Sequence, residues 1–110
     1  MKIAVVGSRE LKNIVLDGHI PVEATEIISG GAVGVDFCAA GYAKNKGLAF
    51  TEFLPQYEKY GRAAPIVRNK EIVNHADKIV VFWNGYSKGT LSVIRYAQKI
   101  GKPLEVILCK

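Results

Sequence analysis

The segment Ile28–Asp36, ISGGAVGVD, holds the residue types that most directly suggest chemistry. Gly30, Gly31 and Gly34 lie between an apolar run and a helical pattern, where the chain turns from a strand into a helix. The first amides of a helix are unpaired and carry a partial positive charge, and glycine lets an anion such as phosphate reach them. The alternative is that these glycines only form the turn.

A second segment, Ser87-Lys88-Gly89-Thr90, repeats this arrangement before the last helical pattern. Its hydroxyls either cap the helix or bind phosphate. Together the two segments favour an anion site more than either does alone. Neither is a complete motif, because Ser29 replaces the first glycine of G-x-G-x-x-G and the Gly-Lys-Ser/Thr order of a P-loop is absent. The missing order argues against kinase-like phosphoryl transfer.

Charged and polar side chains near these segments each have two interpretations. Arg9 and Arg68 have the fork geometry that suits a phosphate or carboxylate, and an exposed structural arginine is the alternative for Arg68. Asp36 either interacts with the helix dipole or accepts a ribose hydroxyl. Asn69 either binds a base or sugar or faces solvent.

The remaining reactive side chains predict no metal site and no nucleophilic catalyst. His19 and His75 have no partner at metal-ligand spacing. The two cysteines form no C-x-x-C pair and are expected to be reduced thiols in a cytoplasmic protein. Three aromatic residues either stack on a base or pack against the protein: Tyr57, Tyr60 and Trp83.

The elements that must position these residues alternate along the chain. Short apolar runs bounded by turn residues predict buried strands, at residues 2–6, 26–29, 48–54, 78–82 and 103–108. Helical spacing appears in residues 35–46, 64–75 and 93–100. Residues 10–24 suggest a further short helix, which Gly18 and Pro21 interrupt.

This alternation predicts an α/β fold: a Rossmann-like three-layer sandwich with a five-stranded, mainly parallel sheet, in one domain spanning residues 1–110. Ligands bind such sheets at the carboxyl ends of the strands. Gly7, Ser8 and Arg9 follow the first strand, and the two glycine segments and Tyr57–Arg62 follow others, so all are expected at one edge. The opposite edge receives plainer connections.

The composition and charge of the chain indicate which kinds of partner to expect. The 49% hydrophobic and 23% charged residues are typical of a soluble globule. No run approaches the roughly 20 apolar residues of a membrane span, so no membrane partner is expected. The net charge of +5 lies in residues 56–110, which carry ten basic against four acidic residues. A basic half attracts phosphate on a nucleotide or a nucleic acid, or is an ordinary solvated surface.

Several motifs in order resemble a known group. The segments VVGSRE, ISGGAVGVD, YGRAAPIVRN, ADKIVVFWNGYSKGT and GKPLEVI look like those of the YspA/YpsA-related branch of the SLOG superfamily, over nearly the whole chain. The resemblance implies a Rossmann-like domain that binds a nucleotide-derived ligand, such as a nucleotide or an ADP-ribose-like molecule, with no required cofactor. SLOG relatives often dimerise, so it also implies a homodimer.

The wider superfamily includes LONELY GUY phosphoribohydrolases, whose Arg-Lys pair and Gly-Gly-x-Gly-Thr-x-x-Glu motif this chain matches only in part. Arg68 matches the arginine and Gly89-Thr90 the Gly-Thr, but Asn69 replaces the lysine and Val93 the glutamate. Cleavage of an N-glycosidic bond needs a carboxylate near the cationic transition state. A non-catalytic binding module is therefore the leading hypothesis. An N-glycosidase using Asp36 or Glu71 is the alternative, and DprA-like binding of single-stranded DNA ranks last.

Overall fold

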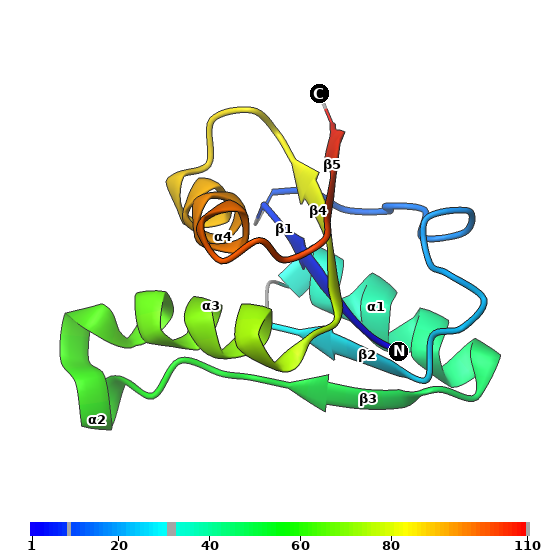
Figure 1. Ribbon diagram of the computed structural model, residues 1–110, viewed down its shortest axis with the longest axis horizontal. Coiled ribbons are helices and arrows are strands. Elements are labelled where there is room, and N and C mark those ends of the chain that lie inside the picture. Colours follow the sequence, from blue (N-terminus) through cyan, green and yellow to red (C-terminus); the bar gives the residue numbers. More distant parts are fainter. Residues whose placement is uncertain (9, 31–32, 110) are drawn as a thin grey trace.

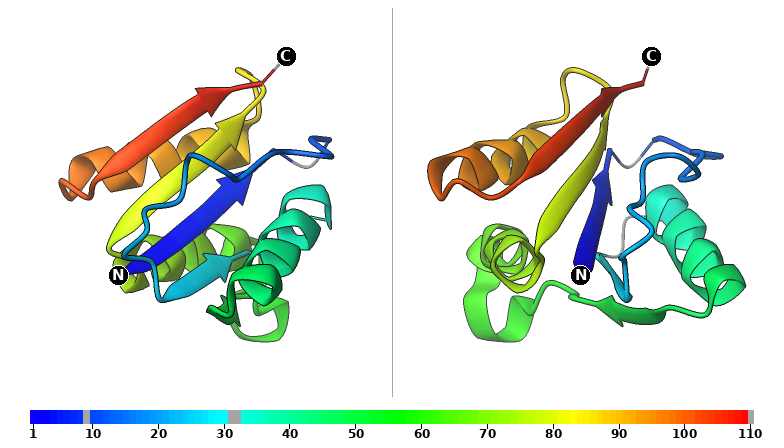
Figure 2. Two further views of the ribbon diagram at one scale, coloured as in Figure 1. Left: turned by 90° about the vertical axis from the view of Figure 1, so that its right-hand side faces the viewer. Right: turned by 45° about the vertical axis from the view of Figure 1, so that its right-hand side comes forward.

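The computed structural model describes residues 1–8, 10–30 and 33–109. Its centre is a five-stranded sheet, formed by β1 (Lys2–Gly7), β2 (Glu26–Ser29), β3 (Ala49–Glu52), β4 (Lys78–Trp83) and β5 (Leu104–Leu108). All four strand pairs are parallel, and the strand order is β3-β2-β1-β4-β5. The arrowheads of β1, β4 and β5 accordingly point the same way in Figure 2. The α/β class with a parallel sheet, predicted from the alternating pattern, is confirmed.

Helices cover both faces of this sheet. Helix α1 (Val33–Lys46) lies on one face, and α3 (Ala64–His75) and α4 (Lys88–Lys99) lie on the other, which gives three layers (Figures 1 and 2). A short helix α2 (Tyr57–Tyr60) and a 3₁₀ helix η1 (Gly61–Ala63) lead into α3. Pro65 lies in the first turn of α3, where its missing N–H costs no hydrogen bond.

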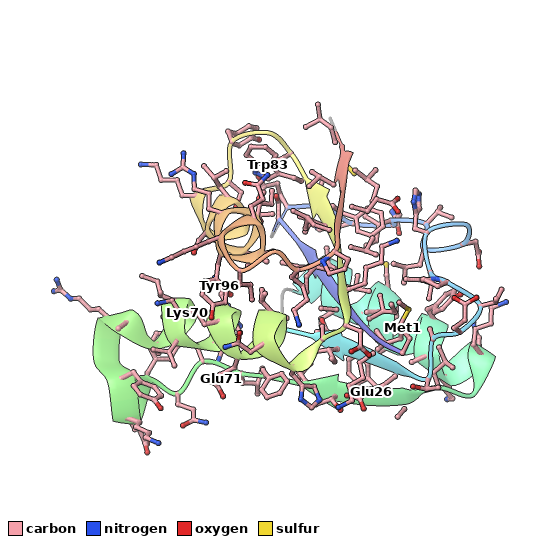
Figure 3. All side chains as sticks on the ribbon, in the orientation of Figure 1. Met1, Glu26, Lys70, Glu71, Trp83 and Tyr96 are labelled. Atoms are coloured by element: carbon pink, nitrogen blue, oxygen red, sulfur yellow. The ribbon has the colours of Figure 1, made fainter. Side chains whose placement is uncertain are left out.

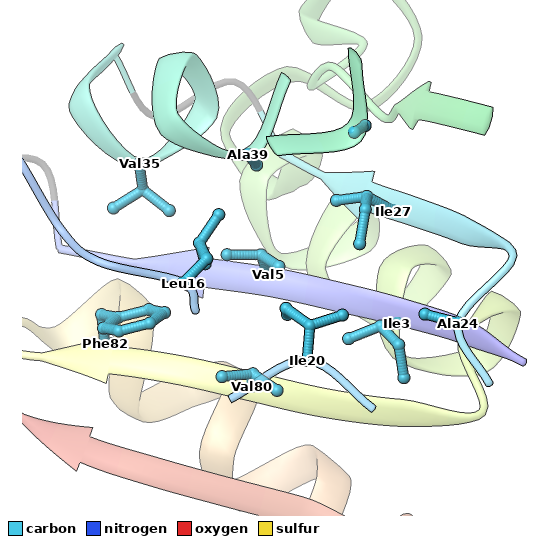
Figure 4. Packing of buried hydrophobic residues seen from close by; sticks show 11 residues of the cluster. Ile3, Val5, Leu16, Ile20, Ala24, Ile27, Val35, Ala39, Val80 and Phe82 are labelled. Atoms are coloured by element: carbon cyan, nitrogen blue, oxygen red, sulfur yellow. The ribbon is translucent and has the colours of Figure 1, made fainter. Parts of the chain in front are cut away.

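The core consists of two apolar clusters, one on each side of the sheet. Strand side chains alternate between the faces, so Ile3 and Val5 of β1 pack towards α1 while Ala4 packs towards α3 and α4. Figure 4 shows Val35 and Ala39 of α1 pointing at the first of these clusters. Because both faces are covered, β1 and β4 read as continuous apolar runs rather than alternating ones.

Residues 10–24 differ from the expected short helix. They form neither helix nor strand, and turn hydrogen bonds such as His19 N to Leu16 O (3.0 Å) hold them instead. Positive φ values at Asn13 (55°) and Gly18 (86°) break the helical path. Of the residues whose spacing suggested the helix, Leu11 and Ile14 pack against the core cluster while Val15 is exposed, and Leu16 and Ile20 are buried in that cluster.

Several boundaries and two elements also differ from the sequence pattern. Strand β3 ends at Glu52 rather than residue 54, α1 begins at Val33 rather than residue 35, and α4 begins at Lys88 rather than residue 93. The other strand boundaries differ by one residue at most. The segments α2 and η1 were not predicted, because neither contains a buried residue and so neither has an apolar stripe. Within the described residues, no helix is both long and apolar enough to cross a lipid bilayer.

Candidate functional site

An open cleft of about 450 Å³ lies at the carboxyl ends of the central strands. The strand order reverses between β1 and β4, and this switch point is where parallel sheets of this kind bind ligands. The volume falls within the range of small-molecule sites. Its lining comes from the ends of β1 and β2, the segment after β3, helix α3 and the first turn of α4.

The floor of the cleft is apolar. It is formed by aliphatic side chains from four elements: Val5, Val6, Val35, Ile72 and Val93. Val93 is buried and stands one turn into α4. The cleft therefore has no carboxylate at that point.

The lining of the cleft combines polar and apolar residues. The polar ones are Arg68, Asn69 and residues of the first turn of α4, and the apolar or aromatic ones include Leu54, Pro55 and Tyr57. Leu54 and Tyr57 are each 57% exposed, so their side chains remain available to a ligand. The cleft thus offers contacts to an anionic group and to a planar apolar group.

Arg68 is held in place by the protein itself. Its Nη1 atom donates to the carbonyl oxygen of Gly30, and its Nε atom donates to Asn69 Oδ1 at 2.9 Å. A Cβ atom on residue 30 would lie 3.3 Å from the guanidinium and 2.9 Å from Ile72, so glycine there makes room for Arg68. A positioned guanidinium is a preorganised anion ligand.

Three hydroxyls connect the end of β1 to the first turn of α4. Ser8 Oγ lies 3.4 Å from Thr90 Oγ1, which in turn lies 3.2 Å from Ser87 Oγ. Ser8 and Thr90 are buried, and only Thr90 and Ser87 border the cleft. The amide of Ser8 already donates to Phe82 O at 3.1 Å. Ser8 therefore contacts Thr90, which borders the cleft, and does not itself line the cleft.

Ser87 caps helix α4. Its Oγ atom accepts from Thr90 N at 3.5 Å, and its carbonyl accepts from Leu91 N at 3.1 Å. Among hydrogen bonds between described residues, none uses the amides of Lys88 and Gly89. The cap thus satisfies the amide of Thr90, and the amides of Lys88 and Gly89 keep no hydrogen-bond acceptor among the described residues.

Gly34 lies in the first turn of α1 and Gly89 in the first turn of α4, and the surroundings of the two glycines differ. A Cβ atom on Gly34 would collide with the carbonyl oxygen of Leu11, so this glycine allows close packing of Leu11 and Lys12 on α1. A Cβ atom on Gly89 would meet nothing within 4 Å, and Gly89 borders the cleft. Packing within the chain therefore explains Gly34 but not Gly89.

The structure brings seven of the predicted site residues to the cleft. These are Gly7, Gly30, Arg68, Asn69, Ser87, Gly89 and Thr90. Ser8, Gly34, Asp36 and Lys88 are not among its lining residues. Arg9 and Gly31 lie outside the described residues.

Asp36 lies against Glu52 of β3 instead of in the cleft. The pKa of Glu52 is raised above its ordinary value, first by a hydrogen bond shared with Asp36, then by burial and by the Asp36 charge. The nearby Asp36 carboxyl therefore favours the neutral form of Glu52. Asp36 Oδ1 is buried and receives no hydrogen bond from the described residues.

Two other candidates also lie outside the cleft lining. Trp83 is half-buried, and its indole Nε1 donates to Ser87 O at 3.1 Å, so its ring braces the loop before α4 (Figure 3). Glu71, proposed as a substitute carboxylate, is on α3 but does not border the cleft (Figure 3). Among the described residues, no three His, Cys, Asp or Glu side chains form a group that could hold a metal ion.

Glu10 is a cleft residue that the sequence pattern did not predict. Glu10 follows the first strand and borders the cleft, where its Oε1 atom accepts from Asn84 Nδ2. Its place directly after VVGSR was a usable signal, because that segment leaves the carboxyl end of the central strand. Leu54, Pro55 and Pro65 were missed because isolated apolar and proline residues have no distinctive spacing.

The chain was compared with models of protein families, with curated protein sequences and with solved structures. No match was found in any of the three comparisons.

Proposed function

We propose that the cleft binds a small phosphorylated ligand of nucleotide type and that the protein is a binding module rather than an enzyme. The observation that carries the proposal is Gly89. Its amide, at the N-terminus of α4, donates to no described residue. No neighbouring atom of the chain requires a glycine at this position. Gly89 borders the cleft, and Arg68 borders it as well. Amides at a helix N-terminus and a guanidinium are typical phosphate ligands.

The apolar and aromatic residues of the cleft lining support a nucleotide over free phosphate. Tyr57, Leu54 and Pro55 line the same cleft as the polar residues and offer apolar contacts on which a base can stack or pack. Val93 supports binding without hydrolysis, since this position of α4 supplies no carboxylate to a cationic transition state. The order of the motifs supports membership of the SLOG branch as part of the same proposal.

Thermal denaturation with nucleoside monophosphates, NAD and ADP-ribose tests this function. A ligand at about 100 times its Kd stabilises the folded protein by about 2.7 kcal/mol. We expect at least one member of the panel to raise the Tm, and Gly89→Ala to reduce that rise because its methyl group enters the space of the anion.

Gly41→Ala is the matched control. Gly41 is an exposed glycine within α1, and a Cβ atom there also meets nothing within 4 Å. This variant is expected to keep the full ligand-induced rise. Absence of a Tm shift with every ligand at millimolar concentration, or equal ligand response in both alanine variants, contradicts the proposal.

A further inference from the structure

Glu10 gives the cleft a negatively charged acceptor beside its proposed phosphate site. Glu10 and Gly89 both border the cleft, and Asn84 and Ser87 connect them. A carboxylate accepts hydrogen bonds and donates none, and it repels phosphate. A ligand that fills this cleft must therefore present donors to Glu10 and its anionic group elsewhere.

The orientation of Glu10 is set by Asn84. The Oδ1 atom of Asn84 accepts from Tyr86 N at 3.0 Å and from Ser87 N at 2.9 Å. Because the oxygen is used in this way, the Nδ2 group is the part of the amide that faces Glu10, and it donates to Oε1. No hydrogen bond from another described residue reaches Oε2, so this atom is the acceptor available to a ligand.

We propose that Glu10 binds the hydroxyl groups of a ribose, so that the cleft selects ribose phosphates over deoxyribose phosphates and over inorganic phosphate. This inference rests on the proposed function, since it requires the phosphate to lie at Gly89 and Arg68. A sugar attached to that phosphate extends along the cleft and meets a carboxylate that Asn84 already holds in place. From the sequence, a ribose hydroxyl was one of two interpretations for Asp36, the other being the helix dipole. Asp36 instead lies against Glu52 and does not border the cleft.

Titrations followed by ¹H–¹⁵N correlation spectra test this selection, because they measure weak binding and report on folding in the same experiment. The probes are ribose 5-phosphate, 2-deoxyribose 5-phosphate and inorganic phosphate. A hydrogen bond to a charged group contributes about 1.5–3 kcal/mol, so we expect the wild type to bind ribose 5-phosphate at least about tenfold more tightly than the deoxy sugar.

Glu10→Gln is the diagnostic variant. Glutamine keeps an acceptor for Asn84 but loses the charge, so we expect it to fold, to lose the ribose preference and to bind inorganic phosphate more tightly. Glu58→Gln is the matched control, because Glu58 is an exposed carboxylate on α2 that does not border the cleft. The control is expected to keep the preference.

The possible outcomes distinguish a failure of the proposed Glu10 role from a failure of the proposed phosphate site. If inorganic phosphate and both sugars bind equally well to the wild type, or if Glu10→Gln keeps the ribose preference, the role of Glu10 is wrong while the phosphate site stands. If none of the three probes binds, the proposed function fails and the ribose selection fails with it.

Discussion

At the scale of single residues, the glycines of the two helix-opening segments fall into different physical classes. Gly34 is required by the neighbouring chain, because Leu11 occupies the space of a side chain. Gly89 has open space at its Cβ position instead, and Gly89 also borders the cleft. A glycine whose absent side chain faces a cleft points to a ligand, whereas a glycine filled by its own chain points to packing.

The space around each helical glycine predicts how a substitution by alanine changes the stability, and Gly34 and Gly41 are expected to differ in sign. Gly34→Ala forces a methyl group against the Leu11 carbonyl, and we expect it to destabilise the protein by about 1–3 kcal/mol. Gly41→Ala, on the exposed side of α1, is expected to stabilise it by about 0.5–1 kcal/mol because alanine loses less backbone entropy. Urea denaturation measures both, and a Gly34→Ala variant as stable as the wild type contradicts the packing argument.

At the scale of elements, the first turn of α4 combines a structural cap with the proposed anion site. The Ser87 side chain caps the helix through Thr90 N, while the amides of Lys88 and Gly89 are unused by other described residues. Asp is as good an N-cap as Ser, but it adds a negative charge. Substitutions at Ser87 therefore separate the two roles of this turn.

Ser87→Ala and Ser87→Asp make this separation measurable. We expect Ser87→Ala to lower the free energy of unfolding by about 1 kcal/mol through loss of the cap. Ser87→Asp is expected to keep the stability but to weaken binding of inorganic phosphate, because its carboxylate competes for the same amides. Urea denaturation and phosphate titration give the two readouts, and tighter phosphate binding by Ser87→Asp rules out an anion site at this turn.

At the scale of the whole molecule, two carboxyl groups give the stability opposite dependences on pH. The pKa of Asp77 is lowered mainly because its side chain accepts from the Lys2 amide at 2.7 Å, which ties the start of β1 to the turn before β4. The pKa of Glu52 is raised by its hydrogen bond with Asp36. Folding therefore releases a proton from the first group and retains one on the second.

The stability that Asp77 contributes is complete above the ordinary aspartate pKa and is lost as the pH falls through its lowered value. For Glu52 the sign is reversed: stability is greatest below the ordinary glutamate pKa and decreases as the pH rises through the raised value. We expect Glu52→Gln to raise the Tm near pH 7 and Asp77→Asn to lower it there. Both differences should shrink in acid, and Asp17→Asn, at an exposed position, is the control.

Much of this architecture was readable from the amino-acid sequence because burial imposes a local pattern. Continuous apolar runs located β1 and β4, which are covered on both faces, and helical spacing with Pro65 located α3 at residues 64–75. The glycine and hydroxyl segments at the strand ends indicated the edge where the cleft lies. These signals are periodic or depend on residues adjacent in the chain.

The tertiary structure alone decided which of the indicated residues share a surface. Asp36 and Glu10 are both acidic residues beside a strand end, yet one pairs with Glu52 and the other borders the cleft. Gly34 and Gly89 look equivalent until Leu11 is seen against the first. The reason is physical: side-chain partners come from segments far apart in the chain, and their meeting depends on strand order and on the packing of α1, α3 and α4, which no local spacing encodes.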